Sequence, residues 1–177
     1  QTLDLTQCSV ENFVRVLDMK TGLLHRTFTA TLPDGKKVAV DAKRFCSMAD
    51  GEIGAIRYQI TPLNFSGEIV ITLSVDADVV NKDSNYDEKF WDEVHKEAQP
   101  GTAIVTAQTR KTFFHVTTAM AYSIESDGKK AVTKVSTNVR EKYADNVVQT
   151  EVKQDVPIVI YKYAAILSSE NHAKDKM

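Results

Sequence analysis

Residues 56–81 of the chain, IRYQITPLNFSGEIVITLSVDADVVN, contain two runs in which apolar and polar side chains alternate. Ile56, Tyr58 and Ile60 alternate with polar residues in the first run, and residues 69–75 alternate in the second. Alternation with a period of two is typical of half-buried β-strands. The segment TPLNFSG at 61–67 separates the two runs. We therefore predict two antiparallel strands joined by this turn.

The same alternation recurs along most of the chain. Further candidate strands cover residues 24–32, 38–46, 102–110, 112–124, 131–138, 147–153 and 156–167. PDG at 33–35 and SDGKK at 126–130 are typical of turns, because proline fixes φ and glycine tolerates a positive φ. Roughly nine or ten strands with short connections favour one all-β domain, a large antiparallel β-sandwich whose sheets bury their alternating faces against each other.

One segment has a different pattern. DSNYDEKFWDEVHKEAQPG at 83–101 starts with turn and cap residues, continues with Phe90, Trp91, Val94 and Ala98 at helical spacing, and ends at Pro-Gly. This pattern predicts one short amphipathic helix inserted between strands. Trp91, the only tryptophan, either packs that helix onto the sandwich or offers its ring to a sugar.

Composition limits the possible functions. The 177 residues carry 22 basic and 24 acidic side chains, with a formal net charge of −2 and no basic stripe of the kind that binds nucleic acid. No apolar run is long enough to cross a bilayer. Two cysteines, Cys8 and Cys46, cannot build a disulfide framework or a four-cysteine zinc site. We expect two reduced thiols and a cytoplasmic protein.

The sequence contains no pattern typical of catalysis. The four histidines do not occur at metal-ligand spacing, and there is no nucleophile elbow or phosphate-binding glycine loop. The acidic residues at 87–93 surround lysines, as on a solvated face. We therefore expect no catalytic, cofactor-binding or metal-binding residue.

Two arginines stand on otherwise apolar strand faces. Arg26 shares its face with Phe28, and Arg44 shares its face with Ala42. If the hairpin closes around residues 33–37, Arg26 is opposite Arg44, and like charges in that position destabilise a sheet. Three explanations remain open: carboxylates elsewhere in the chain, a bound anion, or a neighbouring domain.

Four motifs occur in an order and at a spacing that resemble one family. They are RVLDMKTGLLHRTF at 15–28, KRFCSMAD at 43–50, ITPLNFSGEI at 60–69 and VVN at 79–81. Together they resemble the N-terminal domain of glycoside hydrolase family 65, which includes maltose, trehalose, kojibiose and nigerose phosphorylases. Ala77 and Asp78 stand where the family pattern has Asp-Gly, a small departure within a loop.

The resemblance implies a fold and a parent reaction. It implies a super-sandwich similar to galactose mutarotase over residues 1–167, truncated at its start. A polar tail at 168–177 would lead towards an absent (α/α)6 barrel that carries the catalytic glutamate and the phosphate site. The parent reaction would be phosphorolysis of a maltose- or trehalose-type disaccharide with inversion, giving β-glucose 1-phosphate and glucose, or the related hydrolysis. No catalytic residue of the family maps onto this chain, and no cofactor is implied.

Three hypotheses about function follow. In the first, the chain is a non-catalytic module that supports its own barrel and homodimerisation, and meets disaccharide and phosphate only through the parent enzyme. Its candidate rim or interface residues are Arg26, Arg44, Asn64, Asn81, Phe90 and Trp91. In the second, the chain is a carbohydrate-binding module with its own sugar site. The third, an autonomous enzyme of the mutarotase fold, would need His115 with Glu125 or Glu151.

Overall fold

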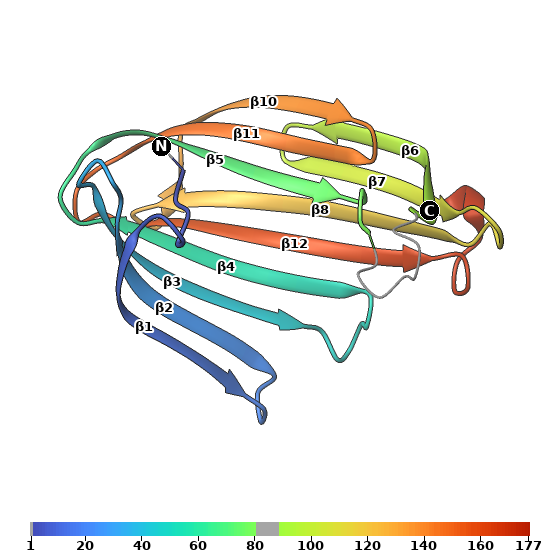
Figure 1. Ribbon diagram of the computed structural model, residues 1–177, viewed down its shortest axis with the longest axis horizontal. Helices are drawn as coiled ribbons and strands as arrows, with labels where there is room; N and C mark the ends of the chain where they lie inside the picture. Colours follow the sequence, from blue (N-terminus) through green and yellow to red (C-terminus); the bar gives the residue numbers. More distant parts are fainter. Residues whose placement is uncertain (1, 81–88) are drawn as a thin grey trace. The chain divides into compact units, whose positions relative to one another are not determined.

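The computed structural model describes residues 2–80 and 89–177, and its regular secondary structure is almost entirely β-strand (Figure 1). The antiparallel sheets form a β-sandwich, as predicted. The strands of the described residues are β1 Ser9–Asp18, β2 Leu23–Thr31, β3 Lys37–Cys46, β4 Ile53–Pro62, β5 Gly67–Asp76, β6 Trp91–Gln99, β7 Thr102–Thr109, β8 His115–Ser126, β9 Lys129–Lys130, β10 Thr133–Arg140, β11 Tyr143–Val152 and β12 Ile158–Ser168. A single 3-10 turn, Lys174–Lys176, follows near the end of this part of the chain.

Two sheets contain these strands. Within residues 2–80 and 89–177, the larger sheet has nine strands in the order β1-β2-β3-β4-β12-β8-β7-β6, with β9 paired to β8. The smaller sheet has three strands in the order β10-β11-β5. Most neighbours in the larger sheet are also neighbours in sequence, and this agrees with the short turns predicted above. No helix in the described part of the chain has the length and apolar character needed to span a membrane.

The connection between β4 and β5 differs from the prediction. Both strands form where expected, but β4 pairs with β3 and β12, whereas β5 pairs with β11 in the other sheet. The prediction of one hairpin was therefore wrong. Alternation shows that each strand has one buried face, and it does not identify the neighbour to which the strand is hydrogen-bonded.

Side-chain hydrogen bonds hold this connection in place. The Asn64 Oδ1 accepts a hydrogen bond from the Lys37 backbone N–H at 2.7 Å, and the Asn64 Nδ2 donates to the Gly35 carbonyl at 2.9 Å. The Ser66 hydroxyl accepts a hydrogen bond from the Gln154 backbone N–H at 2.8 Å. TPLNFSG is thus fastened to the PDG turn and to the segment before β12, which explains why its polar residues are spaced as they are.

The predicted helix at 83–98 is also wrong where the structure describes it. Residues from Trp91 onwards form β6, an edge strand whose register on β7 starts at Trp91 opposite Thr109. The register shifts between Glu93 and His95, as in a β-bulge. A bulge inserts one residue into a strand and interrupts the period of two, so the apolar spacing imitated that of a helix. Residues 81–88 of the predicted segment lie outside the described residues.

β1 was not predicted, for a related reason. Its pairing with β2 is irregular between Glu11 and Val14, and Asn12 has a positive φ of 54°. Most of the strand is exposed. Neither alternation nor burial therefore marked this segment as a strand.

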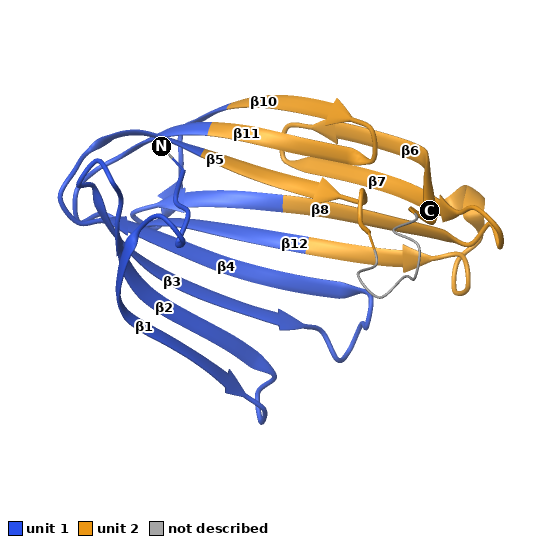
Figure 2. Ribbon diagram, in the orientation of Figure 1, with its two compact units in different colours: residues 1–70, 122–134, 149–163 blue, residues 71–121, 135–148, 164–177 orange. Residues whose placement is uncertain are grey.

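The chain divides into two compact units (Figure 2). Unit 1 comprises residues 1–70, 122–134 and 149–163, and unit 2 comprises residues 71–121, 135–148 and 164–177. The core of unit 1 includes Phe28, Ala30, Val38 and Val40, with a ring of half-buried apolar residues around them. Buried residues of unit 2 include Leu73, Val75, Ala103, Val105, Met120 and Val148.

Candidate functional site

Unit 1 carries two candidate sites, one on each face of β2, β3 and β4. Successive side chains of a strand point to opposite faces, and the printed registers determine which residues share a face. On the core-side face, Phe28 is opposite Val40, and both are buried. On the other face, Thr27 is opposite Asp41 and Asp41 is opposite Gln59. At this row, one face of the strands is part of the hydrophobic core, whereas the other face is polar.

The core-side face becomes cationic further along the strands. The next register row contains Arg15 opposite Arg26, Arg26 opposite Ala42 and Ala42 opposite Tyr58. The row after it continues with Arg44, which lies between residues of β2 and β4. Three arginines from three adjacent strands thus share the face that carries the core of unit 1.

This register corrects the predicted arginine pair. Arg26 is opposite Ala42 on β3, and Arg44 is opposite Leu24, so the two arginines are diagonal neighbours. The shift arises at the turn, where the Leu32 N–H donates to the Lys36 carbonyl at 2.8 Å and draws the hairpin two residues tighter than expected. The like charge directly opposite Arg26 is Arg15 of β1.

The three arginines line a cavity of about 210 Å³, which we call the arginine pocket. Its lining residues are Arg15, Leu24, Arg26, Ala42, Lys43, Arg44, Ile56 and Tyr58. None of them is acidic, and no carboxylate of residues 2–80 or 89–177 forms an ion pair with any of the three arginines. The three arginines therefore concentrate positive charge in the pocket without a carboxylate partner among residues 2–80 and 89–177.

Aromatic rings support two of these arginines. The Arg15 guanidinium lies 5.6 Å from the centroid of the Phe13 ring, and the Arg26 guanidinium lies 5.4 Å from that of Phe28. Arg26 also lies close enough to Tyr58 for its positive charge to act on the Tyr58 hydroxyl. Burial raises the pKa of Tyr58, while the charge of Arg26 opposes that rise. Tyr58 is therefore a neutral hydroxyl beside Arg26.

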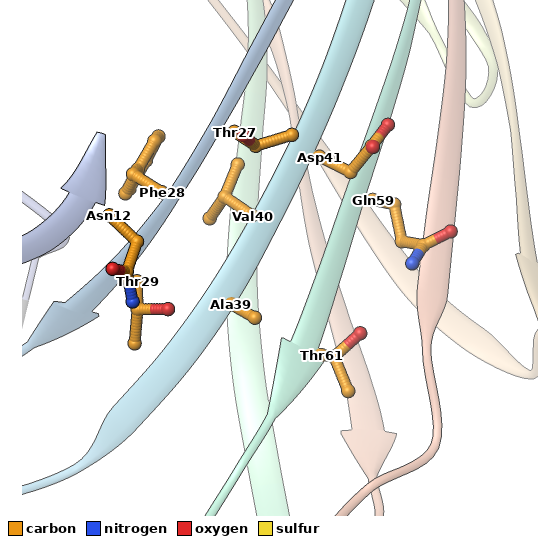
Figure 3. A pocket seen from close by; sticks show the side chains of 9 residues that line it. All are labelled: Asn12, Thr27, Phe28, Thr29, Ala39, Val40, Asp41, Gln59 and Thr61. Carbon is orange, nitrogen blue, oxygen red and sulfur yellow. The ribbon is translucent and has the colours of Figure 1, made fainter. Parts of the chain in front are cut away.

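The opposite face forms a polar groove of about 270 Å³ (Figure 3). Its polar lining residues are Asn12, Thr27, Thr29, Asp41, Gln59 and Thr61. The His25 Nε2 lies 2.9 Å from Asp41 Oδ2, and the Arg57 Nη1 lies 3.3 Å from Asp41 Oδ1. Arg57 also donates to the Gln59 Oε1 at 2.5 Å. Hydroxyl, amide and carboxylate groups thus line one groove, and these contacts orient the Asp41 and Gln59 side chains.

The other predicted site residues that the structure describes line neither the arginine pocket nor the polar groove. Asn64 belongs to unit 1 and its side chain is committed to the turn described above. Phe90 and Trp91 belong to unit 2, where Phe90 is exposed and Trp91 is half-buried on β6. Asn81 lies outside the described residues. Sequence reasoning missed Arg15 and Tyr58 as members of the site, and recognising β1 as a strand would have found Arg15.

Contacts of His115 in the described residues give no support to its predicted pairing with Glu125 or Glu151. His115 Nε2 lies 3.1 Å from the Gln108 Oε1, and burial, followed by the charge of Lys174, lowers the His115 pKa. Across residues 2–80 and 89–177, no three side chains of the metal-binding types come together. His115 thus has a structural hydrogen bond to its neighbouring strand.

Comparison of the chain with known proteins gives consistent relatives. It is 28% identical over 179 residues to maltose phosphorylase of Bacillus subtilis (strain 168), covering all of this chain and 23% of that protein. It is 25% identical over 185 residues to α,α-trehalose phosphorylase of Thermoanaerobacter brockii, covering all of this chain and 24% of that protein. The chain therefore spans about a quarter of the length of these curated relatives.

A structural comparison and a family model complete the assignment. A solved structure assigned as a kojibiose phosphorylase, from the human microbiome, matches with a TM-score of 0.81 and 22% identity, over 97% of this chain and 21% of that one. This likeness establishes the fold. The model of the glycosyl hydrolase family 65 N-terminal domain matches residues 1–177. The chain therefore belongs to the family of glycosyl hydrolase family 65 N-terminal domains.

Proposed function

We propose that the chain is the non-catalytic N-terminal β-sandwich module of a cytoplasmic α-glucoside phosphorylase or hydrolase that acts with inversion. In this role it supports the catalytic barrel and homodimerisation, while the barrel performs the cleavage of a maltose- or trehalose-type disaccharide. The support from comparison is that the curated relatives are disaccharide phosphorylases about four times as long as this chain.

The observation that carries the proposal is an exposed apolar rim beside the arginine pocket. Leu17, Met19 and Met48 are 61%, 86% and 98% exposed, and Phe45 and Ile53 are exposed on the strand face opposite that of Arg44. They come from β1, β3, β4 and the adjoining connections. Exposed apolar patches of this kind mark interaction surfaces, and arginine, methionine and phenylalanine are enriched in protein interfaces. We infer that this end of β1–β4 contacts the rest of the polypeptide.

Cys46 provides a direct test. It is an exposed free thiol at the end of β3, on the same strand face as Arg44. We expect thiol-specific labelling of Cys46 to be at least tenfold slower in the full-length natural polypeptide than in residues 1–177 alone. Site-resolved mass spectrometry measures both rates, and half-buried Cys8 serves as the internal control. Equal Cys46 rates in the two proteins would contradict the proposal.

A carbohydrate-binding module is the second candidate, because the polar groove offers the groups that sugar hydroxyls bind. Calorimetric titration with glucose, maltose, trehalose and kojibiose tests it. If it is correct, one sugar gives saturable heat, and Gln59→Ala removes that heat while Trp91→Ala, in unit 2, does not. If Trp91→Ala removes the heat, the sugar site is elsewhere than the groove. If no sugar gives heat, the carbohydrate-binding candidate is refuted and the scaffold proposal is the one that remains.

A further inference from the structure

The arginine pocket has a charge imbalance that the described part of the chain does not correct. Arg15 and Arg26 are direct cross-strand partners, and this arrangement of like charges is unfavourable. Arg44 adds a third positive charge to the same cavity. Since residues 2–80 and 89–177 contribute no carboxylate to these arginines, an anionic group from elsewhere would relieve the repulsion.

The arginine side chains of the pocket can bind an oxyanion. A guanidinium group donates through a planar fork that matches two oxygens of a carboxylate or phosphate. The Phe13 and Phe28 rings restrict the positions of the Arg15 and Arg26 guanidinium groups. Pre-organised donors lose less conformational entropy when a ligand binds.

The surroundings favour carboxylates carried by a polypeptide over a small free anion. Leu24 and Ile56 form apolar walls of the pocket, and exposed Leu17 is opposite Leu24 on the neighbouring strand. A free phosphate would leave these apolar groups in water, whereas a segment with apolar side chains beside its carboxylates would cover them. The Arg26 and Arg44 rows are two residues apart along the sheet, or about 7 Å.

We propose that the arginine pocket receives the carboxylates of an acidic and apolar segment of the same polypeptide, outside residues 1–177. The segment presents two carboxylates about 7 Å apart, one to the Arg15–Arg26 pair and one to Arg44. This inference rests on the proposed function and adds the chemistry of the partner. It predicts an interface in which charge pairs at the pocket lie next to apolar contacts.

Carbodiimide cross-linking of the full-length natural polypeptide tests the inference. This reagent joins a lysine amine to a carboxylate in direct contact and does not couple arginine. The variants Arg26→Lys and Arg44→Lys each place a reactive amine in the pocket. Arg140→Lys is the matched control, because Arg140 also lies on an aromatic ring, 3.9 Å from the Tyr143 centroid, but does not line the pocket. Equal thermal midpoints would show that the variants are folded.

The expected result is a new cross-link from position 26 or 44 to an aspartate or glutamate outside residues 1–177, with none from position 140. Cross-links only within residues 1–177, cross-links between two copies, or none at all would each overturn the inference. If inorganic phosphate binds by calorimetry and Arg26→Gln abolishes that binding while no cross-link forms, the ligand is a free oxyanion and the inference also fails. Protection of Cys46 without a cross-link would preserve the proposed interface and refute only its carboxylate chemistry.

Discussion

Asn64→Ala should destabilise the chain measurably, although Asn64 is exposed and lies in a connection. Its side chain makes two hydrogen bonds, accepting from the Lys37 N–H and donating to the Gly35 carbonyl. These bonds join the β4–β5 connection to the turn between β2 and β3. Lys37 and Gly35 are 27 and 29 residues from Asn64 in the sequence. Alanine removes both bonds, so that the 2.8 Å backbone hydrogen bond from the Leu63 N–H to the Lys37 carbonyl remains between the connection and the start of β3.

The size of the effect follows from the exposure of these bonds. A net contribution of about 0.5–1 kcal/mol for each hydrogen bond is reasonable where water can replace the lost partner, which gives about 1–2 kcal/mol in total. For 177 residues the unfolding entropy is about 0.37 kcal/mol/K, so the midpoint should fall by about 3–5 °C. Asn64→Asp keeps the acceptor for Lys37 but sets a carboxylate oxygen against the Gly35 carbonyl, and should be destabilised at pH 7 as well.

Calorimetric and urea unfolding of the chain measure both changes. Asn171→Ala is the matched control, because the Asn171 side chain has no hydrogen bond to another residue in the described ranges, and it should shift the midpoint by less than about 1 °C. If Asn64→Ala behaves like Asn171→Ala, the connection is held by something other than these two bonds, and our explanation of the TPLNFSG motif is wrong.

Three further predictions concern unit 1 and unit 2 separately. Gly35 has a φ of +84°, so Gly35→Ala should cost about 1–2 kcal/mol in urea unfolding, whereas Gly51→Ala, where φ is not positive, should cost little. A double-mutant cycle of Arg15→Gln and Arg26→Gln in residues 1–177 should give a repulsive coupling free energy of about 0.2–1 kcal/mol, and salt should reduce it. An attractive coupling would contradict the inference that the two like charges repel each other. A hydrogen bond from Lys96, and then one from the Lys142 N–H, lowers the pKa of Glu93. Because the Glu93 pKa is lower in the folded chain than in the unfolded chain, Glu93 stabilises the fold above its ordinary pKa of 4.5, and this contribution is lost as the pH falls through the folded pKa. Glu93→Gln should therefore flatten the acid limb of a plot of stability against pH, and an unchanged slope would refute the assignment.

The sequence alone determined the features that depend on short-range pattern. The period of two located most of the strands, and Pro-Asp-Gly located the β2–β3 turn, where Gly35 does take a positive φ. Four motifs in order identified the family. Arg26 and Arg44 were selected as candidates because charged residues on an apolar strand face are uncommon, and the structure does bring both into one pocket.

Tertiary structure decided the features that depend on which strands are neighbours. Alternation specifies a buried face but gives no information about the partner strand, so β5 joined β11 and not β4. Bulges in β1 and β6 interrupt the period of two, so one strand was missed and the other was taken for a helix. The arginine pocket includes a residue of β1, and its position depends on the irregularity in that strand. Arg15 is opposite Arg26 only in the register that follows the shift between Glu11 and Val14. The local sequence pattern indicates which side chains are buried and which are exposed. A site made from three strands depends also on the register of those strands, which long-range hydrogen bonds determine.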